Sequence, residues 1–244
     1  MDKMLHPLTW SMRALTDQYE TVANNVANVS TAGFKRRINS FSQVYAQQMG
    51  NINPNDDDIS IEHQKPHIDF SQGLMENTGR NLDVAIMGEG FFSIESPDGV
   101  QYTRNGTFQI DRQRRLVDSN GRFVAGQDGP IIIPPDTPTG QVGIGDDGIV
   151  TASGKAIGKL KLVQFDDQSQ LIPVGDSCFI PREGIKPKDN QTATIVQGFL
   201  ERSNVNHVTE LVDLIQLSRM YESNMKMAKS QDERMNSLIR AATS

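Results

Sequence analysis

The chain has 244 residues, of which 36% are hydrophobic, and its formal net charge is −6 at pH 7. This length suits one large or two modest domains, and no apolar run approaches the roughly 18 residues of a membrane-spanning helix, so membrane insertion is not expected. The N-terminus also lacks the apolar block of a secretory signal peptide. The cationic cluster Lys35–Arg37 is too short to follow a phosphate backbone. We interpret it as a solvated helix end and expect no binding of nucleic acid.

An apolar stripe with alternating three- and four-residue spacing runs through the N-terminal region. Its members are Leu5, Leu8, Met12, Leu15, Tyr19, Val22, Val26 and Val29. This heptad pattern is typical of a coiled-coil seam and predicts a helix over about residues 6–31. Gly33 can end that helix in a left-handed conformation.

Three asparagines, Asn24, Asn25 and Asn28, lie near the end of this stripe. Asparagine lowers helix propensity, so one interpretation is a weak, fraying helix end. The alternative is that each amide donates and accepts hydrogen bonds across a helix interface and so fixes its register.

The middle of the chain predicts β structure. Residues 46–66 read as an exposed acidic loop, whereas residues 68–200 contain short runs of β-forming residues between glycine- and proline-rich turns. Hairpins are expected at Asp98-Gly99, Asn105-Gly106 and Asn120-Gly121.

A second stripe follows near the C-terminus, and it predicts a helix over about residues 206–240 with Asn204 or Asn206 as N-cap. Its apolar members include Leu211, Leu214, Tyr221, Met225, Met235 and Ile239. The two stripes must pair with one another or with copies of the chain, so the sequence indicates an assembly subunit. The expected fold is α+β, divided into an N-terminal helical region (1–45), an acidic loop (46–67), a β-rich body (68–200) and a C-terminal helix (201–244).

No motif predicts catalysis or cofactor binding. His63 and His67 have helical metal-ligand spacing, but Pro66 lies between them. Cys178 falls in a predicted strand with no histidine nearby in the sequence, which favours a buried small side chain over a nucleophile. We therefore expect no enzyme activity, metal or cofactor.

Several segments resemble the bacterial flagellar rod and hook proteins. At the N-terminus this resemblance rests on "ANNVANVSTAGFKR" (residues 23–36), and at the C-terminus on "SNVNHVTELVDLIQLSRMYESNMKMAKSQDERM" (203–235). In the body it rests on "LDVAIMGEGFFSI", "YTRNGTFQID" and "VQGFLERSNV". Within this family the chain looks most like the proximal rod type, with the distal rod type as the alternative.

The resemblance implies a structural subunit of the flagellar basal body, in the periplasmic part of the rod, that stacks helically and transmits torque. It also implies export through the flagellar type III apparatus and contacts with other rod subunits and with copies of the chain. The expected assembly interface comprises Leu8, Met12, Leu15, Tyr19, Val22, Asn24, Asn25, Val26, Asn28, Leu211, Leu214, Tyr221, Asn224, Met225 and Met235. The alternative of another class is a soluble β-rich binding module or enzyme that uses its terminal helices only to oligomerise.

Overall fold

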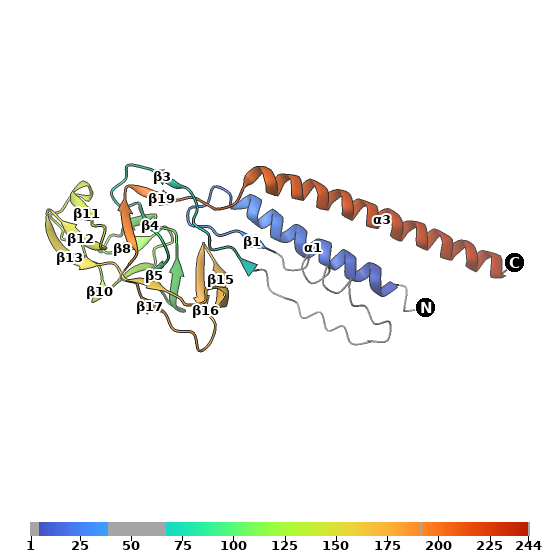
Figure 1. Ribbon diagram of the computed structural model, residues 1–244, viewed down its shortest axis with the longest axis horizontal. Coiled ribbons are helices and arrows are strands. Elements are labelled where there is room, and N and C mark those ends of the chain that lie inside the picture. The colour runs from blue at the N-terminus through green and yellow to red at the C-terminus, as the bar shows by residue number, and fades with distance from the viewer. Residues whose placement is uncertain (1–4, 39–66, 191, 244) are drawn as a thin grey trace. The chain divides into compact units, whose positions relative to one another are not determined.

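The computed structural model describes residues 5–38, 67–190 and 192–243 (Figure 1). These residues form two compact units. The helical unit contains residues 5–27, 37–38, 67–69 and 205–243, and the β unit contains residues 28–36 and 70–204. The α+β class expected from the sequence is confirmed. The predicted acidic loop, apart from its last residue, lies outside the described residues.

The helical unit is built from the two ends of the chain. Helix α1 (Leu5–Ala27) and helix α3 (His207–Thr243) run antiparallel and side by side (Figure 1). Strand β1 (Arg37–Ile38) pairs with β2 (His67–Ile68) in a small antiparallel sheet. Both terminal helices were predicted from their stripes.

The ends of the helices depend on local polar chemistry. The first helix is shorter than predicted: it ends at Ala27, and the next residues form a turn in which Thr31 N donates to Asn28 O at 3.1 Å. Asn206 caps α3, because its Oδ1 accepts from Val208 N and Thr209 N at 3.1 and 3.2 Å. The alternative cap, Asn204, bonds within the β unit instead.

The β unit is entirely antiparallel in its named strand pairs. Its strands are β3 (Met75–Asn77), β4 (Val84–Met87), β5 (Phe91–Ser96), β6 (Gly99–Thr103), β7 (Phe108–Ile110), β8 (Leu116–Asp118), β9 (Phe123–Gly126), β10 (Gly129–Pro130), β11 (Val142–Ile144), β12 (Ile149–Ala152), β13 (Lys155–Lys159), β14 (Leu162–Gln164), β15 (Leu171–Gly175), β16 (Cys178–Pro181), β17 (Lys188–Asp189), β18 (Thr194–Gln197) and β19 (Phe199–Glu201). Two short 3₁₀ helices, η2 (Thr139–Gln141) and η3 (Gln168–Gln170), lie among them.

The largest sheet has ten strands along the order β15-β16-β6-β5-β9-β8-β7, with β10, β14 and β17 attached beside this path. A three-stranded sheet contains β11, β12 and β13. The last two strands return to the first ones, since β18 pairs with β4 and β19 pairs with β3. The β unit is thus closed by residues far apart in the sequence.

Side chains on strand β5 fill both sides of the sheet, because successive residues of a strand point to opposite faces. Phe92 packs edge-on against Phe108, with ring centroids 5.1 Å apart. Phe91 points the other way, towards an aromatic group that contains Phe70 and Phe179. The main core comprises Leu82, Val84, Ile86, Phe92, Ile94, Phe108, Leu116, Val124, Ile131, Ile133, Val142, Ile144, Val150, Leu160, Leu162 and Ile195.

Two of the three predicted hairpins are confirmed. Asp98-Gly99 joins β5 to β6, and Asn120-Gly121 joins β8 to β9. The prediction of a hairpin at Asn105-Gly106 is wrong, because β6 pairs with β5 and β16, whereas β7 pairs with β8. Gly106 instead passes close to β4: its carbonyl accepts from Val84 N, and a Cβ on it would lie 1.8 Å from Val84 O.

Candidate assembly site

The two helices bury part of their apolar stripes against each other. Leu15 and Val22 of α1 form a buried cluster with Leu217 of α3, and Val26 and Leu214 pack against it. Burying an aliphatic side chain of this size contributes about 1.5 to 3 kcal/mol. Packing within one molecule therefore accounts for four residues of the predicted stripes, Leu15, Val22, Val26 and Leu214, together with Leu217.

Apart from Asn25, the remaining predicted residues of the N-terminal region are less buried. Met12 and Asn24 are half-buried, and Tyr19 is exposed. Leu8 lies in α1, but its side chain is outside the described part. Asn28 follows the end of the helix and belongs to the β unit, where its Oδ1 accepts from Thr31 Oγ1 at 3.2 Å.

Three of the six predicted residues of α3 are open to solvent. Leu211, Tyr221 and Met225 are exposed, and Asn224 is half-buried. Met235 lies in α3, but its side chain is not described. Residue 217 was absent from the predicted interface, although positions 210, 214, 217, 221 and 224 fit a heptad as well as the stripe chosen from the sequence.

Asn25 joins three parts of the helical unit. Its side chain is 1% exposed, and its Nδ2 donates to Glu210 Oε2 of α3 at 3.2 Å and to Arg37 O of β1 at 2.8 Å. Its Oδ1 accepts from Arg37 N at 2.9 Å. Burial lowers the pKa of the Arg37 guanidinium. In this geometry one of the three asparagines bridges helices within a single molecule, and Glu210, which is fully buried, was missed in the sequence.

A second face of α3 is apolar and exposed. Its four residues follow the i, i+3, i+4, i+7 spacing and are 37 to 70% exposed: Val208, Leu211, Val212 and Ile215. With 3.6 residues per turn, this face lies roughly opposite Leu214 and Leu217, which pack against α1. Contiguous apolar exposure of this kind marks interaction sites in soluble proteins.

Residues 28–36, here called the strap, belong to the β unit although they directly follow α1. Gly33 N donates to Glu201 O at 2.8 Å, and Arg36 N donates to Asn204 Oδ1 at 2.7 Å. Phe34 and Lys35 of the strap are buried. Gly33 has φ +66°, and a Cβ there would lie 2.3 Å from Asn105 N, so glycine is required both for backbone conformation and for space.

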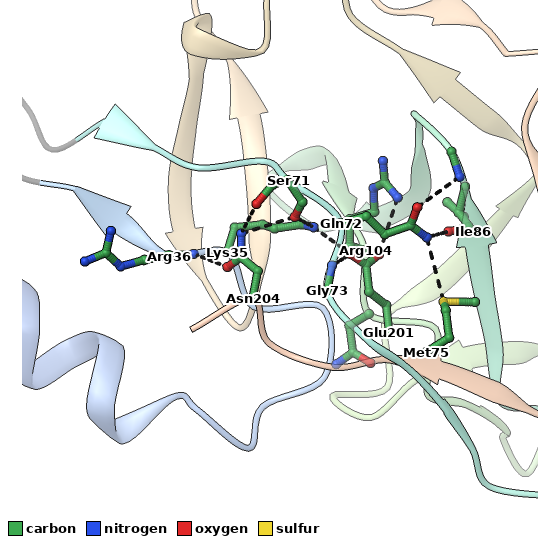
Figure 2. A network of polar contacts seen from close by, with 12 residues as sticks. Lys35, Arg36, Ser71, Gln72, Gly73, Met75, Ile86, Arg104, Glu201 and Asn204 are labelled. Carbon is green, nitrogen blue, oxygen red and sulfur yellow. Dashed lines mark hydrogen bonds and ion pairs between the residues drawn. The ribbon is translucent and has the colours of Figure 1, made fainter. Parts of the chain in front are cut away.

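Lys35 lies in a buried ion cluster (Figure 2). Its Nζ is 2.6 Å from Glu201 Oε1 and donates to Ser71 O at 2.7 Å. Arg104 approaches the second oxygen, with NH1 3.3 Å from Glu201 Oε2. The interpretation of this cation as part of a solvated helix end is therefore wrong. No sequence signal linked Lys35 to Arg104 and Glu201, because ion pairing over such separations leaves no local pattern.

Burial sets the electrostatics of the cluster. It lowers the pKa of the Arg104 guanidinium, and the charge of Glu201 and its hydrogen bond offset part of this effect. Arg104 also lies over the ring of Phe91, with the guanidinium carbon 5.3 Å from the centroid. Glu201 accepts additionally from Gly73 N at 2.9 Å, so both of its oxygens are bonded.

The described part of the chain was searched for metal-ligand groups, a reactive cysteine and membrane-spanning helices. Within residues 5–38, 67–190 and 192–243, no three His, Cys, Asp or Glu side chains are grouped to hold a metal ion. Cys178 is buried in β16, and burial raises the pKa of its thiol. Among the described helices, none is long and apolar enough to cross a membrane.

Two features of the helical unit are typical of proteins that associate with other chains: the paired terminal helices and the open apolar face of α3. Three family models match the chain. They describe a flagella basal body rod protein (residues 11–35), a flagellar hook protein FlgE/F/G D1 domain (85–152) and a flagellar basal body rod FlgEFG protein C-terminal region (196–241).

Curated relatives agree with these models over nearly the whole chain. The flagellar basal-body rod protein FlgG of Buchnera aphidicola subsp. Schizaphis graminum is 35% identical over 89% of this chain and 91% of its own length. FlgF of Caulobacter vibrioides is 33% identical over 98% and 97%, and FlgG of Bacillus subtilis is 32% identical over 93% and 94%. The chain therefore belongs to the flagellar basal-body rod protein family. This membership confirms the expectation of a structural, non-enzymatic protein of the basal-body rod.

Proposed function

We propose that this chain stacks helically with copies of itself and with other rod subunits in the periplasmic part of the rod, where it transmits torque. The observation that carries the proposal is the exposed apolar face of α3 formed by Val208, Leu211, Val212 and Ile215. We infer that neighbouring subunits cover this face and extend the α1–α3 pair into a coiled-coil layer. The interface residues predicted from both stripes remain part of this proposal: those that pack between α1 and α3 hold the helix pair of each subunit together, and the exposed ones contact neighbouring subunits.

Charging this face tests the proposal. We expect the double variant Val212→Asp, Ile215→Asp to remain folded by circular dichroism but to stay monomeric in sedimentation at high concentration. Each introduced carboxylate would have to lose its hydration at the interface without a partner, which costs several kcal/mol. Cells that carry only this variant should not swim.

Met220→Asp, Met227→Asp is the matched control, because it also introduces two carboxylates on α3. Met220 and Met227 are each 54% exposed, close to the 53% of Ile215, but they lie on another side of the helix. This control should assemble more readily than the Val212→Asp, Ile215→Asp variant. Assembly of the latter at the parent's concentration would refute the proposed interface, and equal loss of assembly in the control would show a general effect of charge on the helix.

We assign the chain to the proximal rod type, with the distal type as the alternative, because its one-body length and "RFVAGQDGPIIIP" resemble proximal subunits. A small folded tag at the exposed Asp98-Gly99 turn would mark the subunit in averaged images of isolated basal bodies. Tag density at the membrane end of the rod supports the proximal type, and density at the hook end supports the distal type.

We infer that the flagellar type III apparatus exports the chain. A strain with that apparatus inactivated should retain the protein in the cytoplasm, while the parent strain incorporates it into basal bodies. Equal incorporation in both strains would contradict this route.

A further inference from the structure

One carboxylate, Glu201 at the end of β19, holds the strap to the rest of the β unit (Figure 2). Residues 70–204 of the β unit are here called the body. Lys35 of the strap and Arg104 of the body share this carboxylate, and the side chains of Lys35 and Glu201 are fully buried. The three residues lie in three separate regions matched by family models, the N-terminal, the D1 and the C-terminal one. The cluster therefore joins segments that are remote in the sequence.

Removal of Lys35 and removal of the Glu201 carboxylate have different consequences for the contacts of this cluster. Without Lys35, Glu201 keeps both Arg104 and Gly73 N as partners, and Ser71 O still accepts from Asn204 Nδ2 at 3.1 Å. The charges of Glu201 and Arg104 thus still balance at this point, and the Glu201 carboxylate and Ser71 O each keep a hydrogen-bond donor. Without the carboxylate of Glu201, Lys35 and Arg104 lose the counter-charge that they share, and removing one partner from a buried ion cluster is strongly destabilising.

We propose that the strap is a conditional clasp. The body folds without the strap, and the strap closes onto the folded body only when Glu201 is in place. Body formation comes first, and docking of Gly33, Phe34 and Lys35 follows. Because β19 must already pair with β3 to position Glu201, the clasp reports that the C-terminal strand has arrived. A chain that ends before this strand would keep an open strap.

Hydrogen exchange on the full-length chain tests the clasp. In Lys35→Met, amides of residues 28–36 should exchange at least about tenfold faster than in the parent, including Gly33 N, which donates to Glu201 O. Amides of β5, β6 and β9 should keep their parent rates. Lys188→Met is the control, because it removes a pair of similar length, 2.7 Å to Asp166, that is exposed to solvent.

Glu201→Gln should open the strap at least as much as Lys35→Met and should also speed exchange in β19. If Glu201→Gln does not fold, Lys35→Met still decides the proposal. Unchanged protection of residues 28–36 in Lys35→Met would overturn it, since the strap would not depend on the ion pair. Parallel loss of protection in β5 would also overturn it, since the strap would then be required for the body itself.

Discussion

Asn25→Ala is expected to destabilise the helical unit, although alanine is the better helix former. The substitution removes three hydrogen bonds, two to the backbone of Arg37 and one to Glu210 Oε2. With a net contribution of about 0.5 to 1.5 kcal/mol per bond, the loss is about 1.5 to 4.5 kcal/mol. Higher helix propensity of alanine returns at most about 0.7 kcal/mol, so lower stability should prevail.

Urea unfolding followed by helical ellipticity measures this difference in the full-length chain. Thr16→Ala is the control on the same helix, because Thr16 is exposed and its Oγ1 donates only to Met12 O one turn earlier, at 3.0 Å. We expect Thr16→Ala to match or slightly exceed the parent. Equal stability of the Asn25→Ala and Thr16→Ala chains would refute the reasoning and support a fraying helix end.

Two further predictions concern a core leucine and the single thiol. Leu217→Ala should lower the free energy of unfolding in urea by about 2 to 5 kcal/mol, because Leu217 is only 4% exposed. Leu211→Ala, on the open face, should lower it much less. The reverse order would contradict the placement of α3 against α1. Burial raises the pKa of Cys178 above its ordinary value of 9.0, so its contribution to stability is complete below that pH and declines as the pH rises through the folded-state pKa. The parent should therefore lose more stability than Cys178→Ala between about pH 8 and pH 10, and equal alkaline losses in both chains would contradict this.

Local chemistry made part of the fold predictable. Asp98-Gly99 and Asn120-Gly121 form hairpins because their flanking strands pair directly, and Gly99 and Gly121 adopt the positive φ that such turns need. The same dipeptide type at Asn105-Gly106 does not turn the chain back. There the glycine serves the close approach of Val84 O, which depends on a strand about twenty residues earlier in the chain.

The side of α3 that packs against α1 was not predictable from residue spacing alone. Leu211 and Leu217 belong to two overlapping heptad series on one helix, and apolar residues occur in both. Only the packing of Leu217 with Leu15 and Val22 distinguishes them. Lys35 illustrates a similar limit, since a lysine beside two arginines reads as a solvated charge until its distant carboxylate is known.

The open face of α3 also has a thermal consequence. Contacts made by Val208, Val212 and Ile215 would remove apolar surface from water, and such association carries a negative change in heat capacity. Apolar association weakens on cooling because its driving force near room temperature is entropic. Assemblies held by this face should therefore loosen in the cold and strengthen on warming towards ambient temperature.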